Sequence, residues 1–485
     1  MRMLTRLTIE NFRSIEKCDL TLKPLTFIVG RNNVGKSSLV LPLVLLRSWL
    51  KNAWPPLSNN ATVTLGTELH NSHPALWTIL GNYGDMVHGG DRKKLIRFEV
   101  YFSLGPTEQN ELANLLGSVP WSDGSETNRN DKQSEKIIPI IHDLQFNASG
   151  LGYALAFNGH PMGDEFPTGT IREQRFLDGA GNTIVGLVTD KIQTGPDVSQ
   201  HIDRLSPEYV KQYAHPDSWR LLMFLRDFGS APHLPQLVHH CAKTIHSSIM
   251  TVHFIGEVRD RIPRLSPLGE DPEEVGFNGE NALSLAAFRF GQRKHAKGHK
   301  EFLRWMERLG AGEIGLAHGT MTAGVGENRR SVPGVFWEAP GPGGVPLNIA
   351  SFGSGIQLLA PVVVQCFAAG PGATIVIEEP EIHLHPENQR LMVDLFHDAV
   401  KFGNQIIAAT HSEHFIYRLQ TLVANGDLKP EDIAIIEVTA GKNGTEIEPI
   451  PMDSNGNLDH WPRSFAETGL KAHNELSKAQ RKSDG

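Results

Sequence analysis

The stretch GRNNVGKS, residues 30–37, has the spacing of a phosphate-binding loop. In such a loop, backbone N–H groups converge on phosphate oxygens, and the start of the following helix adds positive potential. We expect Lys36 to reach the terminal phosphates and the Ser37 hydroxyl to bind Mg²⁺. Gly30 and Gly35 permit backbone angles and a close approach that a Cβ would obstruct. The motif therefore predicts binding of a nucleoside triphosphate, with ATP and Mg²⁺ as the expected ligands.

Two carboxylates follow a second apolar stretch. Residues 373–381 read ATIVIEEPE, which predicts a buried strand that delivers Glu378 and Glu379 to its carboxyl end, where α/β sheets place their ligands. Glu378 would hold Mg²⁺ through water, and Glu379 would orient or deprotonate the attacking water. The alternative is a strand that runs into an acidic surface turn.

A third apolar stretch, NQIIAAT, ends in front of His411 and repeats this arrangement. A strand that ends in Thr-His would bring an imidazole to the γ-phosphate of a bound nucleotide. A histidine with only a structural role is the alternative.

Residues 351–357 read SFGSGIQ and precede a predicted helix. Ser354 and Gly355 would then stand at a helix N-terminus, which is a second anion-binding feature in the chain. If two copies of the chain faced each other, one nucleotide could be held from both sides.

These side chains can meet only if the apolar stretches before them form strands of one sheet. The stretch 18–30 is rich in Thr, Leu, Ile and Phe and ends in the loop glycine, so it predicts a single strand. Similar runs predict further strands at 6–12, 95–103, 373–377 and 404–409, and a carboxy-terminal β-like piece at 432–450. The helices expected to flank them lie at about 35–50, 356–369 and 387–401.

Composition and patterning predict five segments along the chain. A polar stretch at 121–135 predicts a flexible loop, and a Pro/Gly-rich stretch at 331–346 is expected to separate elements. The segments are 1–115 with the phosphate loop, 116–204 with β-rich character and the flexible loop, 205–330 as a mainly helical insertion, 331–465 with the acidic strand and His411, and 466–485 as a flexible tail.

The 485 residues carry a formal net charge of −8, with 40% hydrophobic and 21% charged residues. This composition can form a buried core and excludes a dedicated basic nucleic-acid-binding chain. Cys18, Cys241 and Cys366 are too far apart for a dense disulfide framework or a CxxC zinc pair, and they indicate a reducing compartment. The most apolar stretch, 39–46, is too short to span a bilayer. We therefore expect a cytoplasmic protein without a membrane segment.

The order of the motifs GRNNVGKS, SFGSGIQ, IVIEEPEIHLHP and ATHS resembles the ABC-type ATPase head of the RecF/SMC/Rad50 group. Within that group, LTIENFRSIEKCDLTLKPLTFIVGRNNVGKSSLV and EEPEIHLHP are similar to the OLD-like, AAA15/AAA21 ATPases. The resemblance covers about 1–110 and 250–465. It implies an α/β fold: an ABC-type P-loop ATPase head, with a mixed sheet, flanking helices and an antiparallel β subdomain, carrying a mainly helical insertion.

The resemblance also implies a role for each matching residue. Glu378 takes the Walker B position, although many ABC ATPases have Asp there, and Glu379 is the catalytic carboxylate. His411 is the switch histidine. Ser354 and Gly355 form a signature motif that acts on the ATP of a partner copy, with Ile356 in place of the second signature glycine. The Walker A residues are Gly30, Asn33, Gly35, Lys36, Ser37 and Ser38.

Many OLD-like relatives carry a TOPRIM nuclease domain after the ATPase. Here only about 70 residues follow His411, and they lack the acidic Glu…DxD pattern, so a complete nuclease is not expected. Relatives of this shape are ATPases of two-gene antiphage systems such as Septu, with an HNH nuclease partner, or PARIS, with a TOPRIM effector. The resemblance implies a switch whose ATP-driven head-to-head dimerisation, or higher oligomerisation, controls such an effector.

Two other functions stay open at this stage. One is a DNA-repair ATPase similar to RecF or Rad50 that closes around duplex DNA. The basic residues between Arg289 and Arg304 could contact its phosphates, or they could line a solvated helix face. The other is a P-loop enzyme outside the ABC group, such as a kinase, which the SGIQ and EEPE motifs disfavour.

Overall fold

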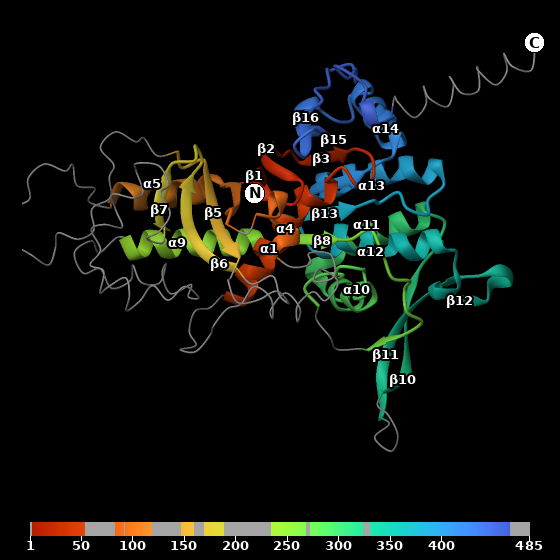
Figure 1. The fold of residues 1–485 in the computed structure, drawn as a ribbon. Coiled ribbons are helices and arrows are strands. Elements are labelled where there is room, and N and C mark those ends of the chain that lie inside the picture. The colour runs from red at the N-terminus through yellow and green to blue at the C-terminus, as the bar shows by residue number, and fades with distance from the viewer. Residues whose placement is uncertain are drawn as a thin grey trace, which may run out of the picture. The chain divides into compact units, whose positions relative to one another are not determined.

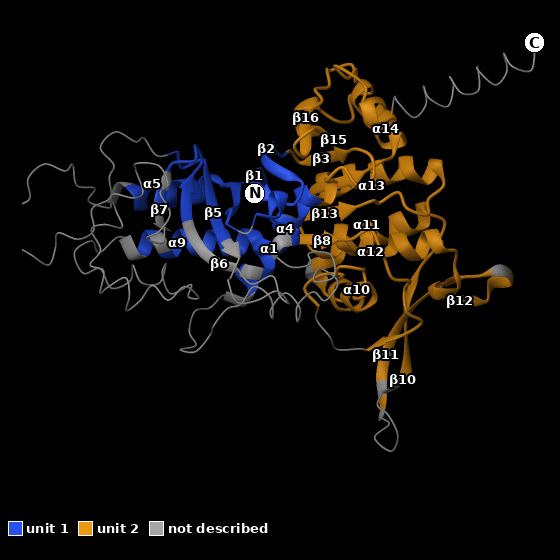
Figure 2. Ribbon diagram, in the orientation of Figure 1, with its two compact units in different colours: residues 1–22, 38–250 blue, residues 23–37, 251–485 orange. Residues whose placement is uncertain are grey.

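The chain divides into two compact units, residues 1–22 with 38–250 (unit 1) and residues 23–37 with 251–485 (unit 2), as Figure 2 shows. The computed structural model describes residues 2–53, 83–91, 93–118, 147–159, 169–188, 234–267, 272–323 and 330–465. Three parts of the sequence predictions lie outside the described residues: the flexible loop at 121–135, the stretch 205–233 of the helical insertion and the tail 466–485.

Unit 2 contains a six-stranded mixed sheet with the strand order β16-β15-β3-β14-β13-β8 (Figure 1). Five of these strands, β15, β3, β14, β13 and β8, run parallel to one another. The edge strand β16 pairs antiparallel with β15. The strands are β3 (Leu25–Val29), β8 (Val252–Ile255), β13 (Thr374–Glu378), β14 (Gln405–Thr410), β15 (Ile433–Ala440) and β16 (Thr445–Pro449).

The three strands that precede the sequence motifs are adjacent at the centre of this sheet. Every residue of β3, β14 and β13 is buried. Such continuous apolar runs are typical of parallel strands that are covered on both faces. Because parallel strands end at the same edge of a sheet, the phosphate loop, the acid pair and His411 all lie at one edge of this sheet.

Helices of unit 2 pack on these strands and share their core. The ring of Phe27 on β3 lies 6.3 Å from Phe396 and 5.8 Å from Phe415, centroid to centroid. Phe396 and Phe415 also contact each other, so these aromatic rings pack one face of β3 against two helices and anchor the loop that follows it. The helices are α10 (Ala282–Phe290), α11 (Ala296–Arg308), α12 (Ser354–Ala368), α13 (Pro386–Phe402) and α14 (Glu413–Ala424).

Helix α13 illustrates how local sequence sets an element's ends. Pro386 stands at its first position, where no N–H is needed, and the His385 side chain accepts a hydrogen bond from the Glu387 N–H. The helix stops at Gly403, whose φ of 111° is left-handed. Among the described residues, 3₁₀ turns lie at His88–Gly90, Arg293–His295, Pro342–Gly344, Ile349–Ser351 and Pro430–Asp432.

A smaller antiparallel sheet completes unit 2. Its main feature is the long hairpin of β10 (Gly315–Ala323) and β11 (Arg330–Pro340), which β9 (Ser266–Pro267) and β12 (Pro346–Asn348) extend. The described part of the predicted helical insertion 205–330 thus holds helices together with β8, β9, β10 and the start of β11.

Unit 1 is built on a six-stranded antiparallel sheet with the order β2-β1-β4-β5-β6-β7. Phe98 lies near its centre, with Phe12 at 5.2 Å and Phe157 at 5.8 Å between ring centroids. The strands are β1 (Leu4–Phe12), β2 (Ile15–Thr21), β4 (Ile96–Ser103), β5 (Gly150–Gly159), β6 (Gly169–Asp178) and β7 (Thr183–Val188). Its described helices are α1 (Lys36–Ala53), whose first two residues count with unit 2, α4 (Tyr83–Met86), α5 (Pro106–Ser118) and α9 (Leu234–Met250).

The predicted α/β architecture, with a mixed sheet, flanking helices and an antiparallel β part, is confirmed. The prediction of one strand over 18–30 is wrong, because β2 ends at Thr21 and β3 begins at Leu25, in a different sheet. Pro24 lies between them and has no N–H with which to continue a ladder. Within the described ranges, no helix is both long and apolar enough to cross a bilayer.

Candidate nucleotide-binding site

The phosphate loop connects the end of β3 to the start of α1. Gly35 has a φ of 107° and Asn33 a φ of 63°, both in the left-handed region that a tight loop of this kind needs. A Cβ on Gly30 would lie 2.4 Å from the carbonyl oxygen of Val438 on β15, so only glycine fits there. The sheet itself therefore requires the first glycine of the motif.

Lys36 is the first residue of α1 and its side chain folds back over the loop. Its Nζ donates hydrogen bonds of 3.0 Å to the carbonyl oxygens of Gly30 and Arg31, and the residue is only 6% exposed. Burial lowers the pKa of Lys36, and the nearby Glu379, whose Oε1 is 3.9 Å from Nζ, opposes that shift. The ammonium group therefore lies between the loop carbonyls and the acid pair.

The two carboxylates at the end of β13 differ in their surroundings. Glu378 is 5% exposed, and its Oε1 has no hydrogen-bond partner among the described residues. Burial raises the pKa of Glu378 to about 7, and the side-chain hydrogen bond with Ser37 opposes the shift. A buried, unpartnered carboxylate oxygen beside a serine hydroxyl is an oxygen donor set that suits Mg²⁺, so these residues fit the predicted metal ligands.

Glu379 lies among the charged groups at this edge of the sheet. Its Oε1 is 3.6 Å from Nδ1 of His411, and this interaction lowers the pKa of Glu379 and raises that of His411. The backbone of Glu379 has a φ of 44°, an angle that residues other than glycine rarely adopt. The structure thus brings Lys36, Glu378, Glu379 and His411 together, as the sequence predicted.

Glu381 is a site residue that the sequence reasoning missed. Its buried Oε1 accepts hydrogen bonds from the Thr410 hydroxyl at 2.6 Å and from the His411 backbone N–H at 2.7 Å. The same oxygen lies 3.3 Å from Nδ1 of His411. Glu381 therefore fixes the end of β14 and orients the imidazole. The third acid of the EEPE motif was the signal for it.

Arg259 is the second residue that the sequence reasoning missed. Its guanidinium donates to the carbonyl oxygens of Glu379 at 2.9 Å and Glu378 at 3.4 Å. The side chain is 8% exposed, and burial lowers its pKa to about 10. It holds the backbone at the point where Glu379 takes its unusual φ. The sequence shows Arg259 in GEVRDR, which has no established spacing to the acids.

The remaining predicted residues lie elsewhere. Ser354 is exposed and begins α12. Gly355 follows it and lies near Leu384, since a Cβ built on Gly355 would be 3.7 Å from a methyl carbon of the Leu384 side chain. Ser38 is buried in α1 and counts with unit 1. Within the described residues, no hydrogen bond or ion pair joins Ser354 to the phosphate loop or to the acid pair.

The predicted DNA-contacting stretch is partly neutralised by its own unit. Arg304 on α11 lies 2.6 Å from carboxylate oxygens of Glu301 and Asp398, and Lys297 lies over the ring of Phe402. Gly298 packs so closely on the α12 backbone that a Cβ there would meet the Phe367 carbonyl oxygen. This part of α11 packs against its neighbours, which weakens the case for a free phosphate-binding face.

Comparison with known proteins supports an ATPase of the AAA type. Residues 3–73 and 291–416 match the family described as "AAA ATPase domain". The two segments hold the phosphate loop, Ser354, the acid pair and His411, and make up less than half of the chain. These segments resemble an AAA ATPase domain.

One curated relative matches over a short stretch. The chain is 46% identical over 55 residues to an "OLD nuclease" of Thermus scotoductus (strain ATCC 700910 / SA-01). The match covers 11% of this chain and 10% of that protein, so it spans about a tenth of the relative's length.

Solved structures of Smc heads are similar at low scores. An SmcHead bound to the C-winged helix domain of ScpA has 13% identity and a TM-score of 0.41, covering 93% of this chain and 98% of that one. A Pyrococcus furiosus Smc head with an extended coiled coil, bound to the C-terminal domain of ScpA, has 14% identity and a TM-score of 0.40, covering 98% and 100%. The SMC head domain from Thermotoga maritima has 11% identity and a TM-score of 0.36, covering 93% and 99%. These values are too low to carry an inference about partners or activity.

Proposed function

We propose that this chain binds and hydrolyses ATP at the edge where β3, β13 and β14 end, and that its nucleotide state controls a separate effector. The observation that carries the proposal is the meeting of the Lys36 ammonium with two carboxylates, Glu378 and Glu379, beside His411. The match to an AAA ATPase domain over the same motifs supports it.

Each side chain has a role that follows from its place. Phosphate oxygens of ATP would replace the loop carbonyls as acceptors for Lys36 Nζ. Glu378 and Ser37 would hold Mg²⁺, and a bound Mg²⁺ would neutralise negative charge on the phosphates. Glu379 lies between Lys36 and His411, so it would orient the attacking water and accept its proton. Attack of this water on the γ-phosphorus would break the bond to ADP and release ADP and phosphate.

The test is the loss of Lys36. Lys36→Ala should abolish ATP binding and turnover while leaving the fold intact, because a phosphate ligand is removed without opening a large core cavity. Lys401→Ala, at an exposed position of α13, is the matched control and should behave as wild type. Turnover by purified Lys36→Ala at the wild-type rate would rule out the phosphate-loop proposal.

We further propose that two copies associate head to head around ATP, in a dimer or a larger oligomer. Ser354 supports this because it is exposed at the start of α12, where a helix N-terminus can reach a phosphate of a facing copy. Ser354→Arg should then lower turnover without reducing ATP binding. A mixture of Ser354→Arg and Lys36→Ala contains one intact composite site in each mixed dimer, so partial activity should return. Confirmed mixed dimers that stay inactive would contradict a shared site.

The effector we propose is a nuclease such as an HNH or TOPRIM protein encoded nearby, in a cytoplasmic antiphage system. The short similarity to an OLD nuclease and the motif resemblance support this proposal. The second candidate is a DNA-repair ATPase that binds duplex DNA, for which the exposed Arg293, Lys297 and Lys300 of the Arg289–Arg304 stretch would supply the phosphate contacts. Salt-dependent binding of duplex DNA by the pure chain would favour repair. ATP-dependent association with a nuclease from the same operon, without such DNA binding, would favour defence.

A further inference from the structure

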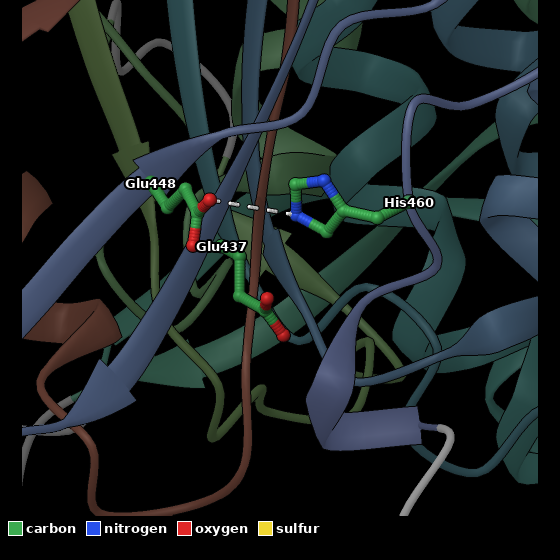
Figure 3. Close-up of side chains that lie close together, drawn as sticks. All are labelled: Glu437, Glu448 and His460. Carbon is green, nitrogen blue, oxygen red and sulfur yellow. Dashed lines mark ion pairs between the residues drawn. The ribbon is translucent and has the colours of Figure 1, made fainter.

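Three side chains with metal-binding atoms lie together at the hairpin of β15 and β16 (Figure 3). Glu437 on β15 is the direct cross-strand partner of Glu448 on β16, and His460 comes from the segment that follows. One carboxylate oxygen from each glutamate and one ring nitrogen of the histidine all lie within 4.8 Å of one another. The Nε2 atom of His460 is 3.8 Å from Oε1 of Glu448, the pair that Figure 3 marks with a dashed line.

Of the two glutamates, Glu448 has an ion pair with Arg463 at 3.1 Å, whereas the buried Glu437 has no cationic partner among the described residues. Like charges directly opposite each other on antiparallel strands are destabilising. Glu437 is only 1% exposed, and its Oε2 has no hydrogen-bond partner in the part of the chain that the structure describes. The buried Nε2 of His460 also has no hydrogen-bond partner there. A carboxylate oxygen left this way costs free energy unless an ion or a donor satisfies it.

The other polar atom of each of these side chains is already held. Nδ1 of His460 contacts Oδ2 of Asp459 at 3.4 Å, which is the carboxylate–histidine contact that orients metal-binding imidazoles. The outer oxygens of the two glutamates accept hydrogen bonds of 3.1 Å, one from the Ser464 backbone N–H and one from the Arg463 guanidinium. Each member is thus fixed from outside and keeps one atom for the centre of the cluster.

We propose that Glu437, Glu448 and His460 bind a divalent transition-metal ion of the Zn²⁺ type. One imidazole nitrogen with two carboxylate oxygens suits Zn²⁺ or Mn²⁺, whereas Mg²⁺ and Ca²⁺ prefer sets of oxygen ligands alone. Zinc–ligand distances of about 2.0–2.2 Å place tetrahedral ligands about 3.3 Å apart, so side-chain shifts of about an ångström close the cluster. The fourth position is left to water.

The ion would tie the segment around His460 to the hairpin. Glu437 is in register with Val29 on β3, the residue just before Gly30. The bound ion would therefore brace the strand next to the phosphate loop, in a structural role that needs no nucleotide. This makes the metal site testable independently of ATP hydrolysis.

The test is metal binding by the nucleotide-free chain of 485 residues after removal of bound metals with a chelator. Equilibrium dialysis against Zn²⁺ or Mn²⁺, followed by elemental analysis, should find one tightly bound ion per chain. Glu437→Gln and His460→Gln should each weaken binding by at least about tenfold. Glu446→Gln is the matched control. Glu446 is an exposed glutamate on β16, the strand that carries Glu448, and its cross-strand partner is Thr439. This variant should bind the ion as wild type does.

Two further measurements separate this site from misfolding and from the nucleotide site. Glutamine at 437 can still accept the Ser464 hydrogen bond and removes a like charge, so metal-free Glu437→Gln should melt no lower than metal-free wild type. Added metal should raise the Tm of wild type but not of this variant. Glu378→Gln should retain the ion. The proposal is overturned if wild type binds no ion, if Glu437→Gln and His460→Gln bind it normally, or if Glu378→Gln loses it.

Discussion

Arg259 offers a way to separate ATP binding from ATP hydrolysis. Its guanidinium donates to the carbonyl oxygens of Glu378 and Glu379, and these hydrogen bonds go to the acid pair rather than to the phosphate loop. Arg259→Met removes these donors and keeps most of the apolar stem of the side chain. The loop should still bind ATP, whereas the backbone at Glu379 loses its tether.

The size of the effect follows from the strain at Glu379. A non-glycine residue with a φ of 44° costs roughly 1–3 kcal/mol, and persists because its surroundings impose it. A hydrogen bond from a charged donor contributes about 1.5–3 kcal/mol. Its loss is enough to let Glu379 relax away from the water position. Since each 1.36 kcal/mol is tenfold in rate, we expect kcat to fall by about 10- to 100-fold.

The assay is steady-state ATP hydrolysis together with ATP affinity and thermal unfolding. The ATP affinity of Arg259→Met should stay within about threefold of wild type, because we expect the free energy of ATP binding at the phosphate loop to change by less than about 1 kcal/mol. Arg259→Lys should restore part of the rate, since it keeps the charge and a donor. Arg261→Met, at an exposed position two residues away, is the control. A folded Arg259→Met protein with wild-type kcat would refute the reasoning.

Two further predictions concern the elements around the site. Gly30→Ala should destabilise the protein and prevent ATP binding, because the new Cβ would lie 2.4 Å from a backbone oxygen; Gly315→Ala, with its nearest atom at 4.0 Å, should be tolerated in the same unfolding and binding measurements. Thr410→Val removes a buried donor to Glu381 and should lower the free energy of unfolding in urea by about 1–3 kcal/mol. Thr421→Val, which removes an exposed hydroxyl hydrogen bond, should cost less, and equal costs for the two would contradict the role given to Glu381.

The sequence allowed the nucleotide site to be located because its residues follow apolar runs. Each of the stretches before Gly30, Glu378 and His411 is continuously buried. A continuous apolar run in the sequence is enough to predict such a buried parallel strand, and parallel strands end at the same edge of their sheet. The loop spacing adds a second local signal.

Other features depend on contacts that no local pattern encodes. Arg259 contacts carbonyl oxygens 119 and 120 residues further along the chain, and Glu437 meets His460 only once the hairpin has formed. The stretch 331–346 was expected to separate elements because of its Pro and Gly content. Instead, residues up to Pro340 form β11, where Pro333 pairs opposite Thr320. Proline is tolerated in a strand where its position requires no N–H.

The central claim is that Glu379 activates the water that hydrolyses ATP. Its most direct test is single-turnover hydrolysis by Glu379→Gln, with ATP affinity measured on the same protein and Glu387→Gln, exposed on α13, as the control. Glutamine is nearly isosteric but cannot accept the proton, so hydrolysis should fall by about 10²–10⁴-fold while ATP stays bound and association of copies becomes long-lived. Hydrolysis at the wild-type rate in this variant would contradict the account.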